Sequence, residues 1–172
     1  WSSDVCSSDL EKAYSFFSGA IEEDPTLFAP HVVLSWLSDG DAKKMHKEKA
    51  KELVQGKNEN SQLFVSILDF EGPDNATKRN EIWSKMHGIE PDGGFINYMY
   101  AWTIQDRKER INEFENFLKQ EKEDGDTYFH ILNALGYAYY NIDEKEKAKA
   151  ELERYLHYYQ RYHNHNHSLK LA

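Results

Sequence analysis

The chain has 172 residues, with 21 Lys and Arg against 30 Asp and Glu, which gives a formal net charge of −9. This acidic balance argues against nucleic acid as a partner, because neutralising phosphates requires a basic face. The single cysteine excludes a disulfide framework and a Cys-based zinc site. No apolar run approaches the roughly 20 residues that cross a membrane, and the small number of Gly and Pro residues disfavours a turn-rich all-β fold.

The two ends of the chain differ from the rest. Residues 1–10 repeat Ser-Ser-Asp without a helical period, and we expect a non-native or disordered tail there, either translated adapter sequence or a genuine polar extension. Residues 163–172 begin with an alternation of His and Asn, which runs through 163–167. Such a tract can bind Zn or Ni, but no carboxylate lies among the imidazoles to orient them, so we expect a solvated, disordered tail. The helical domain is therefore expected at 11–162.

Apolar residues at helical spacing predict a series of short helices from residue 11 onward. The first helix ends at Asp24-Pro25, since the residue before a proline avoids the α region. Further helices are predicted at 28–37, 42–55, 61–70, 75–88, 95–105, 107–123, 127–140 and 144–162. Asp106 and Asp143 each precede a glutamate by three residues, a pattern typical of capping boxes rather than of catalytic carboxylates.

The most regular part of the pattern is the last pair of predicted helices. Asn133-Ala-Leu-Gly-Tyr-Ala-Tyr-Tyr140 followed by Lys147-Ala-Lys-Ala-Glu-Leu152 resembles the tetratricopeptide repeat (TPR), as does Ala20-Ile-Glu-Glu-Asp-Pro25. That repeat is a helix–turn–helix unit of about 34 residues. Gly136 and Ala148 are small enough to let the two helices of one hairpin approach closely. Each hairpin is too small to bury its own apolar side, so neighbouring hairpins must stack.

The resemblance covers about 11–162 and implies an all-α fold, a right-handed α-solenoid of about four to five stacked TPR-like repeats. It is specific at both ends and weak between them. Trp83, Met86 and Pro91 have the spacing of Phe17, Ala20 and Pro25, but Arg79 occupies the position of Ala13. A variant or non-TPR stack of α-hairpins remains the alternative for the middle of the chain.

The resemblance also implies a concave groove lined by the first helix of each repeat. Most of the side chains expected there are aromatic, and they suit the capture of a peptide. The partner-binding groove is predicted from Phe64, Leu68, Tyr98, Trp102, His130, Asn133, Tyr137 and Tyr140, with Phe95 and Gln105 beside them. The alternative is that several of these residues only pack against the next repeat. The family's Lys, Arg and Asn clamp for a terminal carboxylate has no match, so we expect no carboxylate-clamp binding.

The sequence lacks the motifs of common enzyme classes. It has no Gly-rich phosphate loop, no Gly-x-Ser-x-Gly elbow and no His-Glu-x-x-His zinc helix. His31, His46 and His87 are far apart in the sequence and are expected at the surface or in the groove rather than as bases. Asp39-Gly-Asp41 and Asp124-Gly-Asp126 lack the ligand spacing of an EF-hand loop. We therefore predict a non-enzymatic protein with no cofactor and no metal.

Two functions of different classes fit these features. The leading hypothesis is a protein–protein interaction scaffold that binds a peptide or helix of a partner in the groove. The alternative is a helical accessory or regulatory region of a larger protein, because the chain begins within a repeat, as a fragment of a bacterial gene would. Self-association through incomplete repeat ends is also predicted. The absence of cysteine from 11–172 suits the cytoplasm and the bacterial periplasm alike.

Overall fold

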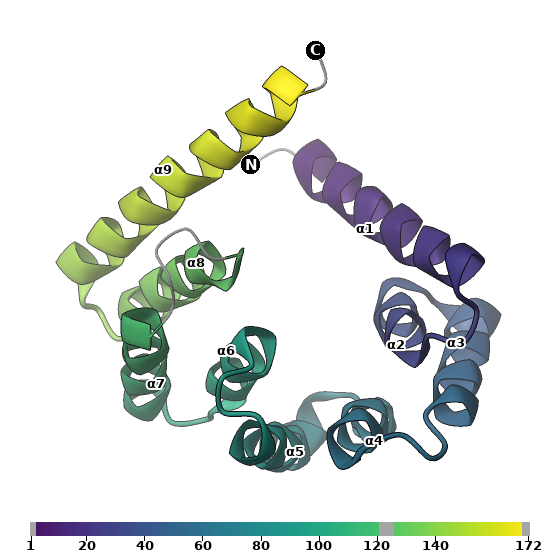
Figure 1. The fold of residues 1–172 in the computed structure, drawn as a ribbon. Helices are drawn as coiled ribbons and strands as arrows, with labels where there is room; N and C mark the ends of the chain where they lie inside the picture. Colours follow the sequence, from purple (N-terminus) through teal and green to yellow (C-terminus); the bar gives the residue numbers. More distant parts are fainter. Residues whose placement is uncertain (1–2, 121–125, 170–172) are drawn as a thin grey trace. The chain divides into compact units, whose positions relative to one another are not determined.

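The protein is all-α in the part of the chain that the structure describes. The computed structural model describes the backbone of residues 3–120 and 126–169, and the side chains of 10–120 and 129–161. Within these ranges the chain forms α-helices and two short 3-10 turns, and no strand (Figure 1). This confirms the predicted fold class at the level of all-α. The chain divides into two compact units, unit 1 (residues 1–71) and unit 2 (residues 72–172), which are described separately.

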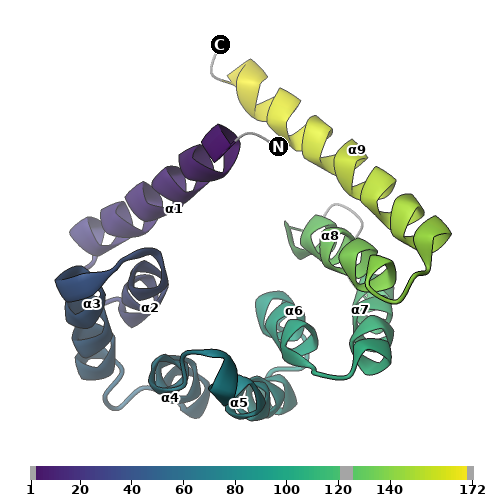
Figure 2. The same ribbon diagram turned by 180° about the vertical axis from the view of Figure 1, so that it is seen from behind.

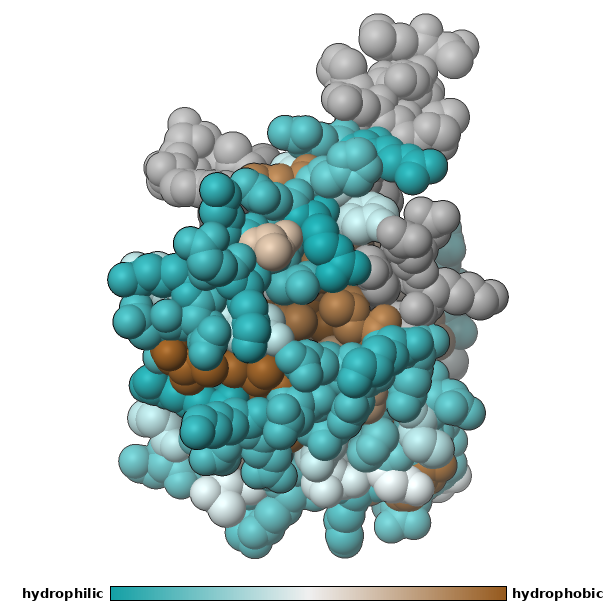
Figure 3. Space-filling view, turned by 90° about the vertical axis from the view of Figure 1, so that its left-hand side faces the viewer, coloured by the Kyte–Doolittle hydropathy of each residue, from teal (hydrophilic) through white to brown (hydrophobic). Residues whose placement is uncertain are grey.

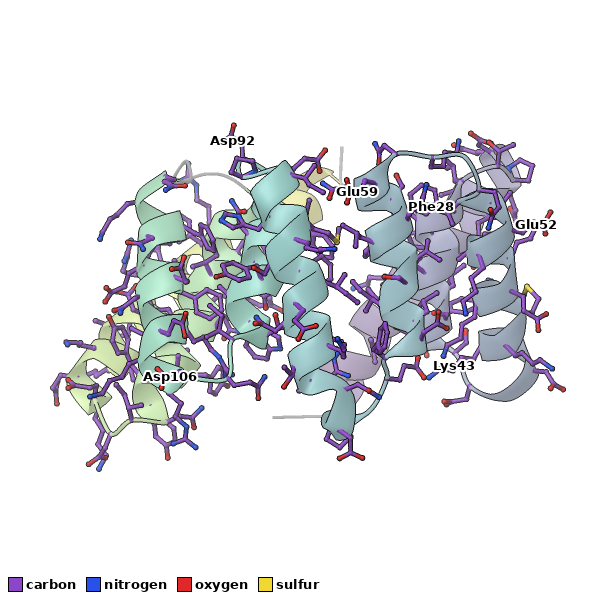
Figure 4. The ribbon with its side chains drawn as sticks, turned by 90° about the horizontal axis from the view of Figure 1, so that it is seen from below. Phe28, Lys43, Glu52, Glu59, Asp92 and Asp106 are labelled. Carbon is purple, nitrogen blue, oxygen red and sulfur yellow. The ribbon has the colours of Figure 1, made fainter. Side chains whose placement is uncertain are left out.

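Unit 1 contains four helices and a short 3-10 turn among its described residues. They are α1 (Ser3–Glu23), α2 (Phe28–Leu37), α3 (Gly40–Leu53), α4 (Glu59–Ser66) and the turn η1 (Ile67–Asp69). Helix α2 packs against both α1 and α3. The core between α2, α3, α4 and η1 is made of Val32, Ala50, Val54, Val65 and Leu68. Figure 4 shows Phe28 at the start of α2, and Lys43 and Glu52 near opposite ends of α3.

Unit 2 begins with the 3-10 turn η2 (Pro73–Asn75) and continues through five described helices. These are α5 (Ala76–Ile89), α6 (Gly94–Thr103), α7 (Arg107–Gln120), α8 (Asp126–Tyr140) and α9 (Lys145–Leu169). Each helix from α5 to α8 packs against the next one, and α6 also contacts α8. Within this unit α6 and α8 lie side by side, with α5, α7 and α9 around them (Figures 1 and 2).

The main hydrophobic cluster of unit 2 contains residues from every helix of the unit except α5. Residues of α6, α7, α8 and α9 form one buried cluster, which comprises Ala101, Ile111, Phe114, Phe117, Ile131, Ala134, Leu135, Ala138, Tyr139 and Ala148. Gly136 and Ala148 allow α8 and α9 to approach each other closely, as expected from the sequence. A Cβ atom built on Gly136 would lie 3.4 Å from the backbone oxygen of Ala148, which confirms the close approach of α8 and α9.

Most predicted helix boundaries agree with the structure to within a few residues, and α2 agrees at both ends. The differences lie mainly at the ends of the chain. Residues 3–10 belong to α1 and residues 163–169 belong to α9, where the sequence analysis expected tails. Neither stretch contains glycine or proline, the residues that most strongly oppose helix propagation. The side chains of residues 3–9 and 162–172, including the terminal histidines, lie outside the described ones.

One of the two predicted capping aspartates is confirmed and the other is wrong. The Asp106 carboxylate accepts hydrogen bonds from the backbone N–H groups of Lys108 and Glu109, both at 2.9 Å, and so caps α7 (Figure 4). Asp143 instead ends the preceding helix. Its φ is 65°, and the N–H groups of Asp143 and Glu144 donate to the carbonyls of Tyr140 and Tyr139 at 3.1 and 3.0 Å. This is the Schellman pattern, which places Asp143 after the end of α8.

Among the described residues, none of the helices combines the length and the apolar character needed to cross a membrane.

Candidate functional site

The predicted groove residues of unit 2 lie on two neighbouring helices. Tyr98 and Trp102 lie on α6, and His130, Asn133, Tyr137 and Tyr140 lie on α8, at helical spacings that put each set on one side of its helix. We call these six residues, together with Phe95, the α6–α8 face. Four members of the face, Phe95, Trp102, Tyr137 and Tyr140, are between 47% and 62% exposed. Large aromatic side chains with that much exposure are candidates for partner contacts.

Ring contacts join the two helices within this face. The Tyr98 ring stacks on Trp102, with centroids 6.3 Å apart and planes 17° apart, and lies 6.3 Å from the ring of His130 on α8. On its other side Tyr98 packs 6.1 Å from Phe114 of the core. Burial raises the pKa of Tyr98 above that of a free tyrosine. Tyr98 therefore anchors the exposed rings to the hydrophobic core beneath them.

The remaining groove residues of unit 2 have individual surroundings. Phe95 lies edge-on against Trp83 of α5, at 5.8 Å between ring centroids. Asn133 is half-buried, whereas Gln105 is exposed and uses its Nε2 to donate to the carbonyl of Thr103 at 2.8 Å. Gln105 therefore lies two residues beyond the end of α6, and its place in the groove stays a prediction.

Charged residues are rare on the two helices that carry the face. Helix α6 has no Asp, Glu, Lys or Arg, and α8 has only Asp126, whose side chain lies outside the described ones. Half of the residues of α7 are charged, and the first half of α9 is rich in Lys and Glu. Figure 3 shows one side of the molecule as a mainly hydrophilic surface with smaller hydrophobic areas. A ligand that covers the α6–α8 face would therefore desolvate few charges, which keeps the cost of binding low.

A polar network fixes the start of α6. The His87 Nδ1 atom lies 2.7 Å from the Asn97 Oδ1 atom, and the Asn97 amide donates to the carbonyl of Pro91 at 2.8 Å. Because that amide oxygen can only accept, His87 carries its proton on Nδ1. The His87 ring also stacks on Tyr100 at 4.9 Å and 5°. The turn between α5 and α6 is thereby held to both helices.

A second contact fixes the rotation of α8. The Tyr139 hydroxyl donates to the carboxylate of Glu115 on α7, and Lys147 lies 5.4 Å above the Tyr139 ring. Burial and the bond to Glu115 raise the pKa of Tyr139 far above its usual value. With Tyr139 turned toward α7, its neighbours Tyr137 and Tyr140 point away from the core and are exposed.

In unit 1 the predicted groove residues behave differently. The prediction for Leu68 is wrong: it is 2% exposed and belongs to the core, because the chain passes from α4 into the 3-10 turn η1 at Ile67 and the helical spacing changes there. Phe64 is half-buried, with its ring 5.8 Å from that of Trp36 in an edge-on arrangement. Trp36 is exposed and was not predicted, although a tryptophan at the end of an apolar helix was visible in the sequence.

The expected surface or groove position of two histidines is also wrong. His31 of α2 and His46 of α3 are buried, and their Nδ1 atoms lie 2.8 Å apart. Burial lowers the pKa of both imidazoles, and the charges of His46 and Lys49 lower that of His31 further. His87 is half-buried rather than exposed.

Among the described residues there is no group of three or more His, Cys, Asp and Glu side chains that could hold a metal ion. Comparisons with models of protein families, with curated proteins and with solved structures find no match to this chain.

Proposed function

We propose that the protein is an interaction scaffold without catalytic activity, and that its α6–α8 face binds a peptide or helix of a partner protein. The observation that carries this proposal is the set of half-exposed aromatic rings on two adjacent helices that have almost no charged residues. Aromatic side chains bring a large contact area at a small loss of entropy, and they dominate the binding energy of many interfaces.

The proposal extends to the architecture. The helices stack as TPR-like hairpins in a right-handed solenoid, with α6 and α7 forming one hairpin and α8 and α9 the next. Two features of unit 2 support this arrangement. Helix α6 contacts both its hairpin partner α7 and the first helix of the next hairpin, α8. The close approach of Gly136 to α9 is what the glycine of the repeat motif provides.

The chemistry of the face indicates what kind of segment it binds. The ring faces of Tyr98 and Trp102 accept apolar side chains, and the hydroxyls of Tyr137 and Tyr140 and the amide of Asn133 can hydrogen-bond a peptide backbone. Helix α6 has no Asp, Glu, Lys or Arg side chain that could form an ion pair with a charge on the ligand. Burying an unpaired charge is costly, so the bound segment is uncharged over the length that contacts the rings.

The experiment is a selection from a displayed library of random peptides, followed by measurement of Kd for individual synthetic peptides. We expect enrichment of uncharged, apolar sequences. The double variant Trp102→Ala/Tyr137→Ala should weaken binding of the selected peptides by about 30-fold or more, since loss of a hot-spot residue costs about 2 kcal/mol or more. Phe16→Ala is the matched control, because Phe16 is an exposed aromatic residue of unit 1.

Two results would contradict the proposal. One is a selection that enriches no sequence above background on the native protein. The other is binding that the double variant retains in full while circular dichroism shows its helices to be intact.

A further inference from the structure

The histidine pair of unit 1 connects the two helices of one hairpin. His31 lies on α2 and His46 on α3, 15 residues apart in the chain. Their side chains are 5% and 7% exposed, their ring centroids are 5.1 Å apart, and their Nδ1 atoms face each other at 2.8 Å. A buried polar contact of this kind stabilises the hairpin only while the hydrogen bond is intact, because a buried polar group that loses its partner is costly.

The hydrogen bond requires a specific protonation state. One Nδ1 atom donates its proton and the other accepts with its lone pair, so the accepting ring is neutral and carries its proton on Nε2. Once both rings are protonated, two N–H groups point at each other and both rings carry a positive charge. The contact then changes from a hydrogen bond into a repulsion between buried cations.

The charged side chains near the pair influence how strongly the two cations repel each other. The elements that pack against this hairpin include α1, α4 and η1. Besides His46, the charged side chain that lowers the pKa of His31 is Lys49, whose Nζ atom also lies 2.9 Å from a carboxylate oxygen of Glu52. Lys43 and Lys47 of α3 are engaged with Glu71, at 3.1 and 3.0 Å. The charge of Lys49 therefore adds to the repulsion within a protonated pair.

We propose that the His31–His46 pair is an acid-sensitive latch, and that protonation of both rings opens the α2–α3 hairpin of unit 1 as the solution becomes acidic. The inference does not depend on the proposed binding function, because it concerns a different unit and different residues. It assigns a regulatory role to two histidines that the α6–α8 face does not use.

The size of the effect follows from proton linkage. The pKa of each imidazole is lowered in the folded hairpin from 6.5, so the open chain binds more protons and stability falls as the pH falls through 6.5. Between pH 7.0 and 5.5 each histidine that protonates only on opening raises the opening constant by about eightfold, and two histidines raise it by at most about 70-fold.

The test is amide hydrogen exchange of the intact chain at pH 7.0 and 5.5, corrected for the intrinsic pH dependence of exchange. We expect peptides that cover α2 and α3 to lose protection by 10-fold to 70-fold at pH 5.5 relative to peptides from 131–139 of α8. The variant His31→Leu/His46→Leu should remove this difference, since replacing both partners with apolar groups of similar size avoids an unpaired polar group. His87→Gln, a histidine of unit 2, should leave the response of α2 and α3 unchanged.

Equal loss of protection in α2–α3 and in α8 would overturn the latch, because it would indicate general acid unfolding. The latch would also be overturned if α2 and α3 of the double leucine variant lost as much protection at pH 5.5 as those of the native protein. If that variant does not fold, imidazole nitrogen NMR of the native chain decides. One ring with its proton on Nδ1 and one with its proton on Nε2 at pH 7 supports the latch. Titration of both rings at or above pH 6.5 contradicts it.

Discussion

Gly136 of α8 lies so close to Leu152 of α9 that a Cβ atom added at the glycine would come within 2.6 Å of the Leu152 Cγ atom and 2.8 Å of its Cδ2 atom. Both distances are far below van der Waals contact, so an added methyl group requires the leucine or the helix to move. The pair therefore sets the spacing between α8 and α9. It also gives a physical reason for the glycine in the Ala-Leu-Gly-Tyr segment of the sequence.

The variant Gly136→Ala is expected to destabilise unit 2 by about 1–2 kcal/mol. Overpacking a close contact costs about 1–3 kcal/mol, and the higher helix propensity of alanine offsets up to 1 kcal/mol of that. Urea denaturation followed by circular dichroism measures the change. Gly88→Ala in α5 is the control, because a Cβ atom there meets nothing within 4 Å and should be neutral or slightly stabilising. Equal effects at both positions would show that crowding at Leu152 is unimportant.

Removal of the Tyr139 hydroxyl is expected to loosen α8 from α7. Tyr139→Phe deletes the hydrogen bond to the Glu115 carboxylate, and bonds to charged groups contribute about 1.5–3 kcal/mol. We expect a loss of that order in the free energy of unfolding measured by urea denaturation. Tyr140→Phe changes an exposed neighbour by the same single atom and should leave stability unaltered. A Tyr139→Phe variant as stable as the native protein would contradict the assigned bond.

A measurement of stability can distinguish between a core position and a groove position for Leu68. Leu68→Ala should reduce the stability of unit 1 by about 2–5 kcal/mol, the usual cost of truncating a buried leucine. Trp102→Ala, at an exposed member of the α6–α8 face, should cost much less. Thermal unfolding of the two variants provides the comparison. A loss below 1 kcal/mol for Leu68→Ala would place that residue back at the surface.

The ion pairs of Glu71 also predict a loss of stability as the pH falls, at lower pH than for the histidine latch, together with a dependence on salt. Partial burial acts to raise the pKa of Glu71, but hydrogen bonds and charges from Lys47 and Lys43 outweigh it and lower the pKa. The stabilisation is present at neutral pH and is lost as the pH falls below 4.5 and through the lowered value. Since Glu71 is 38% exposed, we expect Glu71→Gln to cost less than about 1 kcal/mol.

Urea denaturation of Glu71→Gln at pH 7 in low salt and in 1 M NaCl is the measurement for this contribution. The difference from the native protein should shrink in high salt, where exposed ion pairs are screened. A difference that persists unchanged in 1 M NaCl would indicate that Glu71 acts through packing.

The sequence was sufficient to locate the helices because their signals are local. Proline after Asp24 and the apolar spacing of 28–37 act within a few residues, and the helix limits there agree with the structure. The close approach at Gly136 could also be predicted, since small residues in a repeat pattern have few other roles.

Features that depend on contacts between distant residues could not be predicted. His31 and His46 are polar residues by composition, and only the packing of α2 on α3 reveals that they share a buried hydrogen bond. The sequence predicts Leu68 in the groove because its pattern continues as one helix over 61–70, whereas the chain changes to the 3-10 turn η1 at Ile67. The sequence does not distinguish two roles for Asp143, because an aspartate between two helices can follow the end of the first or cap the start of the second. The positive φ of Asp143 shows that it follows the end of α8.

The absence of Lys, Arg, Asp and Glu from α6 has a kinetic consequence. Long-range attraction accelerates the encounter of many proteins with charged ligands, but a segment without charges is not steered by the field of the protein. A ligand of the α6–α8 face would arrive by unaided diffusion, with an association rate constant of about 10⁵–10⁶ M⁻¹s⁻¹. That rate would be nearly the same in dilute buffer and in concentrated salt. Selectivity between ligands would therefore come from differences in their dissociation rate constants.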